Sequence, residues 1–147
     1  EMSSSLALAQ FCELHIVHVW RALGESSLRF GFEQQPEADV DAYVEGIREK
    51  HQQHLDALVA EFVSNTGRDA VDYIKPQIHL VKGFARDVVP QLVKENQIDL
   101  VTMGTVGRTG IPGFIMGNTA EIILSQINCS VLAIKPQGFV TPVTLAQ

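Results

Sequence analysis

The sequence predicts one α/β domain built as a three-layer sandwich, with a parallel β-sheet between two layers of helices. The first observation is alternation: short runs rich in β-branched residues follow longer runs with apolar residues at every third or fourth position. The second is the run DLVTM at 99–103, whose apolar residues occupy both faces of a strand, as in the centre of a parallel sheet. A length of 147 residues fits a single core.

The expected elements follow from these patterns in chain order. Helices are expected at 3–11, 39–64, 88–93 and 120–127, and strands at 13–20, 78–81, 99–103 and 129–134. The long helix is expected to stop near Gly67. Residues 21–37 contain Gly24 and Pro36 and show no period, which predicts a loop. Pro90 is expected in the first turn of its helix, because a proline further inside removes a hydrogen bond.

Net charge and hydropathy exclude several classes of partner. The net charge is −6, so no basic face is available for broad nucleic-acid binding. No apolar run approaches the roughly 20 residues that span a bilayer, and the start lacks the basic-then-apolar pattern of a secretory signal. Cys12 and Cys129 lie in apolar runs and are expected to be buried, reduced thiols. These features predict a cytoplasmic protein without a membrane partner.

A glycine-rich segment, MGTVGRTGIPGFIMGNT at 103–119, leaves an expected strand and enters an expected helix. Its glycines Gly104, Gly107 and Gly117 have the spacing G-x2-G-x9-G. Glycines let the backbone approach a ligand closely and take positive φ, and the first amides of a helix favour an anion. Ligands of parallel sheets lie at the carboxyl ends of strands. The segment therefore predicts a phosphate site.

The same segment has a purely structural interpretation. Asn118 and Glu121 are spaced as a capping box in which Asn118 caps the helix, and Gly117 would then be an ordinary turn glycine. Two better-known phosphate loops are excluded, because Arg108 follows Gly107 where a Walker loop needs lysine, and a dinucleotide fingerprint follows the first strand. From the residues alone, a turn and a ligand site both remain open.

The spacing of the three glycines, followed by Asn-Thr, resembles the nucleotide-binding signature of the universal stress protein family. The strand ending at His18-Val19, the strand ending at Gly83 and the final NCSVLAIKP are also similar to that family, so the likeness runs from about 6 to 136. The GNTAE motif and the KPQGFVTPV tail are most similar to the second domain of the tandem, two-domain type.

This resemblance implies a Rossmann-like sandwich of the adenine-nucleotide α-hydrolase type, with strand order 3-2-1-4-5. It also implies that the first strand, which carries a nucleotide-holding Asp in the family, is missing from this chain. Residues 1–137 would then be an N-terminally incomplete universal stress protein domain, and 138–147 a C-terminal tail. The last strand, at 130–134, is implied to pair with a second copy or with a tandem universal stress domain.

The resemblance also assigns a site for ATP or AMP, with or without Mg²⁺. The backbone of the residue matching Val19 meets adenine in nucleotide-binding members. The implied ribose- and phosphate-lining residues are Met103, Gly104, Gly107 and Arg108, and the implied phosphate-holding residues are Gly117, Asn118 and Thr119. Asn118 stands where the family has a hydroxyl, and its amide group can also donate to phosphate.

The expected function is a stress-response, nucleotide-binding regulatory module rather than an enzyme, with slow ATP hydrolysis at most. No catalytic set of side chains can be assembled from the sequence. His51 and His54 are three apart on a helix but lack a third ligand, so no metal site is predicted, and His18 and His79 are expected to be structural. The alternative is an interaction or dimerisation module whose site is empty or takes a non-nucleotide ligand.

Overall fold

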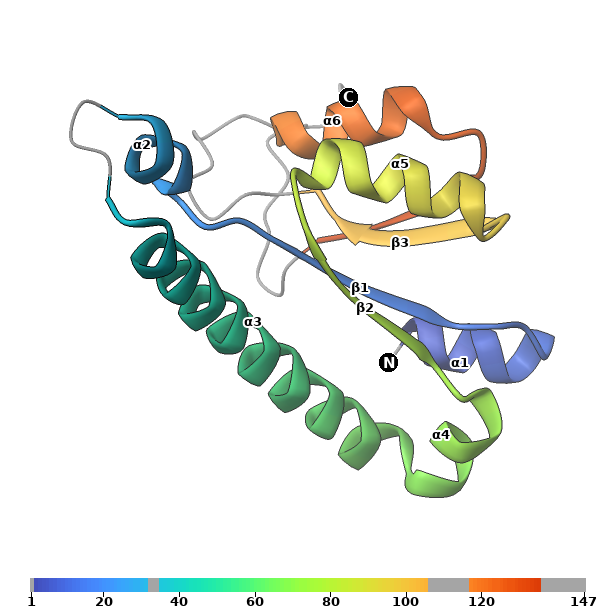
Figure 1. Cartoon of the computed structure of the whole chain (residues 1–147). Helices are drawn as coiled ribbons and strands as arrows, with labels where there is room; N and C mark the ends of the chain where they lie inside the picture. The colour runs from blue at the N-terminus through green and yellow to red at the C-terminus, as the bar shows by residue number, and fades with distance from the viewer. Residues whose placement is uncertain (1, 32–34, 106–116, 136–147) are drawn as a thin grey trace, which may run out of the picture. The chain divides into compact units, whose positions relative to one another are not determined.

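The computed structural model describes residues 2–31, 35–105 and 117–135. Within them the chain forms, in order, α1 (Met2–Gln10), β1 (His15–Trp20), α2 (Glu25–Phe30), α3 (Glu37–Thr66), α4 (Arg68–Ile74), β2 (Gln77–Lys82), α5 (Ala85–Glu95), β3 (Leu100–Gly104), α6 (Asn118–Gln126) and β4 (Ser130–Ile134) (Figure 1). The chain divides into two compact units, Glu1–Phe84 (unit 1) and Ala85–Gln147 (unit 2). Each unit is described by itself.

Unit 1 is built on one pair of parallel strands. β1 pairs with β2 in a register that runs from His15 opposite Gln77 to Trp20 opposite Lys82. The long helix α3 packs on both strands, and its apolar face supplies Leu55, which is 2% exposed. Trp20, at the end of β1, is also buried. The three- and four-residue apolar spacing of α3 therefore faces the strand pair, as an amphipathic helix requires.

Unit 2 repeats this arrangement with shorter elements. β3 pairs in parallel with β4, and the register runs from Leu100 opposite Ser130 to Gly104 opposite Ile134. The helices α5 and α6 pack against each other, and Ala120 and Ile123 of α6 are buried. The pattern of apolar residues expected at 120–127 thus forms the buried side of a helix.

The two strand pairs are the neighbours that the strand order implied by the family resemblance predicts. In the order 3-2-1-4-5 the four strands of this chain would be strands 2 to 5, so the expected neighbours are β1 with β2 and β3 with β4. The described residues form these two pairs as separate two-stranded sheets, and not one continuous sheet. The α/β class with parallel strands is confirmed, while the complete strand order stays a prediction, as does the boundary between 1–137 and 138–147.

The expected loop at 21–37 is wrong in part, because it contains the helix α2. Gly24, just before the helix, has a φ of 86° in the left-handed region that favours glycine. Arg29 on α2 donates to Glu25 one turn earlier and to Asp41 on α3. A six-residue helix is too short to be stable alone, so these contacts with the rest of unit 1 stabilise it. The helix α4, which follows Gly67 directly, was also not predicted.

Two smaller expectations are also corrected. Pro90 is the sixth residue of α5, beyond the first turn in which it was expected. The helix continues through it with one fewer backbone donor, and packing against α6 compensates for that loss. Cys12 and Cys129 are both free thiols, as expected, but Cys12 is exposed and Cys129 is only partly buried.

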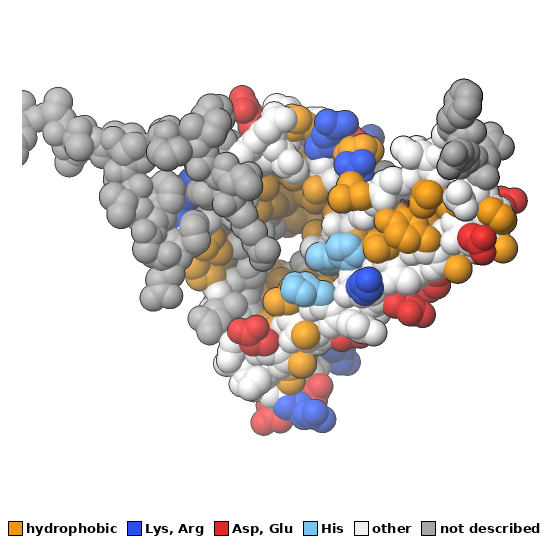
Figure 2. Space-filling view, turned by 90° about the vertical axis from the view of Figure 1, so that its left-hand side faces the viewer, with side chains coloured by type: hydrophobic (Ala, Val, Ile, Leu, Met, Phe, Trp, Pro, Cys, Tyr) orange, Lys and Arg blue, Asp and Glu red, His pale blue; other side chains and the backbone are white. Residues whose placement is uncertain are grey.

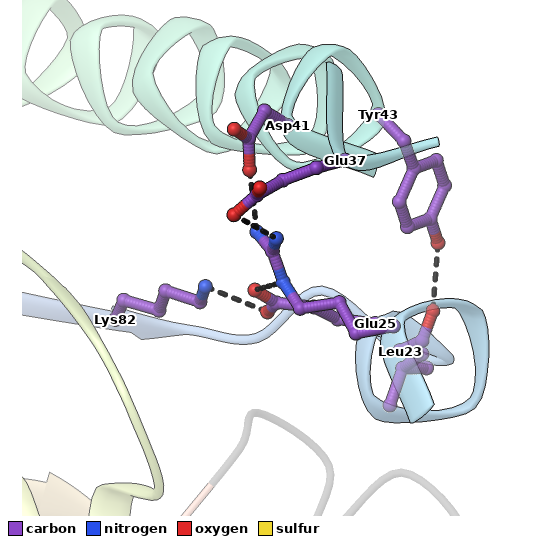
Figure 3. Close-up of polar contacts among 7 residues, drawn as sticks. Leu23, Glu25, Glu37, Asp41, Tyr43 and Lys82 are labelled. Atoms are coloured by element: carbon purple, nitrogen blue, oxygen red, sulfur yellow. Dashed lines mark hydrogen bonds and ion pairs between the residues drawn. The ribbon is translucent and has the colours of Figure 1, made fainter. Parts of the chain in front are cut away.

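A polar network joins α2 to α3 and to β2 (Figure 3). Glu25 accepts from Arg29 at 3.2 Å and from Lys82 Nζ at 2.6 Å. The Tyr43 hydroxyl on α3 donates to the carbonyl of Leu23, just before α2, at 2.7 Å. The hydrogen bond from Lys82 is the main cause that lowers the pKa of the Glu25 carboxyl, and Arg29 adds to it. Glu25 therefore links α2 to β2, and its partner Arg29 links α2 to α3.

The lowered pKa predicts an acid-dependent part of the stability. Because the unfolded chain binds a proton at Glu25 near the ordinary pKa of 4.5 and the folded chain only at lower pH, the free energy of unfolding falls as pH drops below 4.5. Glu25→Gln removes this titration. We expect urea unfolding of the variant to be less stable near pH 6 and to depend less on pH between about 5 and 3.

Glu45→Gln is the matched control, because Glu45 pairs with Arg48 on the exposed side of α3. This substitution is expected to leave the pH dependence close to that of the wild type, since exposed pairs add little stability. Equal pH profiles for Glu25→Gln and the wild type would show that the network does not act through Glu25.

Candidate functional site

The carboxyl ends of β3 and β4 meet at one edge of unit 2. Gly104 and Ile134 are register partners, so the residues that follow them, Thr105 and Lys135, leave the sheet side by side. Thr105 is 1% exposed, and its hydroxyl accepts a hydrogen bond from Lys135 Nζ at 2.6 Å. This contact places a cation at the end of the strand pair, where ligands of parallel sheets are held.

The start of α6 is fixed to the same edge. The amide of Gly117 donates to the carbonyl of Thr105 at 2.7 Å, although 12 residues separate them. Gly117 is the N-cap of α6 and accepts the first helical bond, from Glu121, at 3.0 Å. The other amides of the first turn have no partner within the helix, and they carry the positive end of the helix dipole. An anion at this edge would meet both this helix end and Lys135.

The capping-box interpretation of this segment is wrong. Asn118 is the first residue of α6 and not its N-cap, so its side chain does not hold the position that a capping box requires. The N-cap is Gly117, which has no side chain to accept an amide. The start of α6 therefore lacks the side-chain cap that the purely structural interpretation of this segment requires.

The expectation of positive φ is also wrong at the two described loop glycines. Gly117 has φ −76° and ψ 145°, which is extended backbone open to any residue. Gly104 is likewise outside the left-handed region, and a Cβ added there would lie 4.0 Å from the carbonyl oxygen of Ile134, an ordinary contact. The close approach of a ligand can still explain why these two positions are glycine. A backbone conformation that only glycine readily adopts cannot.

The predicted site residues fall into three groups. Met103, Gly104, Gly117, Asn118 and Thr119 lie at the carboxyl edge of unit 2, and of these Met103 and Gly117 are partly buried while the others are exposed. Val19 lies in unit 1 as the last residue but one of β1, opposite Val81. Gly107 and Arg108 lie outside the described residues. The assignment of nucleotide contacts to these eight residues stays a prediction.

Sequence reasoning missed Thr105 and Lys135. Both sit directly after strands that were predicted, and parallel pairing brings the ends of neighbouring strands together. A lysine that directly follows the last strand, beside the glycine-rich end of β3, therefore indicates a cation at the predicted phosphate site. Making this inference requires the register of β3 and β4, which the sequence alone does not provide.

His18 and His79, the two histidines expected to be structural, each contact another histidine of unit 1. His51 on α3 lies against His18 on β1, with Nδ1 and Nε2 2.8 Å apart. In the described ranges, no three or more His, Cys, Asp or Glu side chains are arranged to hold a metal ion. A search of the described helices finds none with the length and apolarity needed to cross a membrane.

The parallel strand pairs, the helices over them and the helix end at a carboxyl edge define a Rossmann-like α/β fold. Residues 1–135 match the family model described as the universal stress protein family. The chain belongs to this family.

Relatives and solved structures agree with this assignment. The chain is 32% identical over 135 residues to "Universal stress protein E homolog" of Haemophilus influenzae, covering 92% of this chain and 40% of the relative. It is 37% identical over 110 residues to "Universal stress protein E" of Escherichia coli K12, covering 75% and 32%. The chain thus spans less than half the length of these relatives. Its fold resembles a universal stress protein UspA from Lactobacillus plantarum, with TM-score 0.65, 16% identity and coverage of 90% and 84%.

The buried hydroxyl at the edge gives a test of the local structure. Thr105→Val keeps the shape of the side chain and removes the acceptor for Lys135. We expect a loss of about 1.5–3 kcal/mol in the free energy of unfolding, measured with urea, because one hydrogen bond to a charged donor is lost. Thr119→Val, at an exposed position on α6, is the control and is expected to change stability by less than about 0.5 kcal/mol. Equal effects of the two substitutions would contradict a stabilising role for the Thr105 hydroxyl.

Proposed function

We propose that this chain is a stress-response regulatory module that binds an adenine nucleotide, ATP or AMP, with its phosphates at the carboxyl edge of unit 2. The observation that carries the proposal is the hydrogen bond from the Gly117 amide to the Thr105 carbonyl. It fixes the amino end of α6 beside the end of β3, next to Lys135. Membership of the universal stress protein family supports a stress-related role.

Each proposed contact has a physical basis. The amides at the start of α6 and the side-chain amide of Asn118 donate to phosphate oxygens, and Lys135 adds a positive charge. Met103 and Gly104, at the end of β3, are proposed to line ribose and phosphates. Hydrogen bonds to a charged group contribute about 1.5–3 kcal/mol each, so a few of them reach micromolar affinity after the costs of association. Mg²⁺ bound to the phosphates is compatible with this arrangement.

The presence or absence of bound nucleotide is proposed to act as the signal. The nucleotide is not proposed to be a substrate that is hydrolysed quickly. The groups at the edge are amides, a hydroxyl and an ammonium, which stabilise a bound phosphate. None of these groups is a general base that activates water. Hydrolysis of ATP is therefore expected to be slow at most. We propose the cytoplasm as the location, which the two free thiols support.

The sharpest test of the phosphate site is Gly117→Val. Because Gly117 has extended backbone, valine fits the main chain, and the β-branched side chain places methyl groups beside the amides that would hold phosphate. Isothermal titration of the full chain with ATP is expected to show at least a tenfold loss of affinity, about 1.4 kcal/mol.

Gly46→Val is the matched control, since a Cβ added at Gly46 on α3 meets no atom within 4 Å. It is expected to leave ATP affinity unchanged, and circular dichroism checks that both variants fold. Equal affinity of folded Gly117→Val and the wild type would show that the phosphates do not bind on this helix end.

A second candidate is an interaction module that pairs through β4. In the described residues β4 pairs only with β3, so its other edge is open to another strand. The strand is short and apolar, and its last residue, Ile134, is 37% exposed. The proposed partner is a second copy of this domain or a tandem universal stress domain, and the greater length of the relatives supports the latter. Nucleic acid and membranes are not proposed as partners of a chain with net charge −6.

Ile134→Glu tests the pairing, because a carboxylate on an apolar strand edge opposes association. Light scattering during size-exclusion chromatography is expected to show a shift from dimer toward monomer. Leu58→Glu, at a 47% exposed position on α3, is the control and should keep the wild-type mass. A wild-type chain that stays monomeric at high concentration would contradict pairing between copies.

A further inference from the structure

The five histidines of the chain all lie in unit 1, where their rings form two groups. His15 and His79 are stacked, with Nδ1 and Nε2 3.0 Å apart. In the other group, Nε2 of His18 lies 2.8 Å from Nδ1 of His51, and the ring centre of His54 lies 6.2 Å from that of His18. Figure 2 shows histidine side chains at the surface. His54 is exposed and the other four histidines are partly buried, so protons from solvent can reach both groups.

The contact between His18 and His51 joins elements that are distant in sequence. His18 is on β1, and His51 is 33 residues later on α3. A contact of this length between ring nitrogens is a hydrogen bond in which one ring donates and the other accepts, so the accepting nitrogen must be unprotonated. When both rings are protonated, both nitrogens are donors and two positive charges lie in contact. The bond therefore exists only while at least one ring is neutral.

The surroundings of His18 favour its neutral form. On α3, His51 and His54 face it, and on β2 the ammonium of Lys82 lies 5.9 Å from the ring centre of neighbouring Trp20. Burial lowers the pKa of His18 below its ordinary value of 6.5, and the charges of His51 and His54 lower it further. Since the unfolded chain takes up this proton near 6.5 and the folded chain at lower pH, stability falls as pH drops below 6.5.

Burial and neighbouring charge also act on the second group, His15 and His79, but a nearby carboxylate weakens their effect. Burial lowers the pKa of His79, and the charge of His15 lowers it further. His15 also faces the Glu13 carboxylate, 3.6 Å from its Nε2, and this carboxylate offsets part of a positive charge there. This pair joins β1 to β2, which backbone pairing already holds together. Its protonation is therefore expected to weaken the sheet without separating its strands.

We propose that the contact between His18 and His51 is a pH-sensitive latch, in which a pair with at least one neutral imidazole holds α3 on β1 and protonation of both rings releases that part of the helix. The latch acts within unit 1 and does not depend on nucleotide. Trp20 reports on it, because the Trp20 ring is buried and its centre lies 5.8 Å from that of His51. Release of α3 would expose the indole to water and place a charged imidazole beside it.

The experiment uses the full chain, whose only tryptophan is Trp20. Intrinsic fluorescence and the midpoint of urea unfolding are measured from about pH 8 to about pH 5, above the range in which most carboxylates titrate. We expect the emission to change and the urea midpoint to fall as the pH drops below 6.5. The variant His18→Gln/His51→Gln is expected to lose most of both changes, because glutamine hydrogen-bonds without titrating.

His15→Gln/His79→Gln is the matched control, with two substitutions in the group that lacks ring contact with Trp20 in the described residues. It is expected to keep the fluorescence transition. An unchanged emission in the wild type, or a wild-type transition in His18→Gln/His51→Gln, would overturn the proposal. If that variant does not fold, an NMR titration of the wild-type imidazole signals decides: a His18 pKa below 6.5 supports the latch, and one at or above 6.5 overturns it.

Discussion

Both strand pairs are parallel, and a parallel pair can be joined only by a crossover that returns the chain to the starting end of the sheet. In unit 1 the crossover contains α2, α3 and α4, and in unit 2 it contains α6. This constraint places helices over the strands and brings the carboxyl ends of paired strands to one edge. The position of Thr105 beside Lys135 follows from it, and so does the start of a helix at the same edge.

The crossover in unit 1 is held to the strands by polar contacts at two places along α3. Near its start, Asp41 binds Arg29 of α2, which is linked through Glu25 to Lys82 at the end of β2. Near its middle, His51 binds His18 on β1, close to the buried Leu55. The apolar face supplies most of the stabilisation, and the polar contacts fix how the helix lies along the strands. Both polar contacts involve titratable groups, so the packing of α3 is expected to depend on pH.

Local patterns in the sequence predicted the strands and the long helix, because burial against one partner leaves a period of two or of three to four residues. The features that were missed depend on contacts between distant residues. The helix α2 needs Asp41, 12 residues beyond Arg29, and Gly117 caps α6 because its amide donates to Thr105. The pairs Lys135–Thr105 and His18–His51 are 30 and 33 residues apart. The spacing of residues within one element carries no information on such contacts. The glycine-rich segment could therefore be located from the sequence, but the position of Lys135 beside it could not.

The contact between Lys135 and Thr105 also bears on how a phosphate would be held. An ammonium has three donors, and the Thr105 hydroxyl accepts one of them. The bond to Thr105 keeps this ammonium in position at the edge where the phosphate is proposed to bind. Because the chain carries a net charge of −6, its overall field opposes an anion. The attraction has to come from groups close to the phosphate, and the amino end of α6 together with a positioned lysine supplies it at short range.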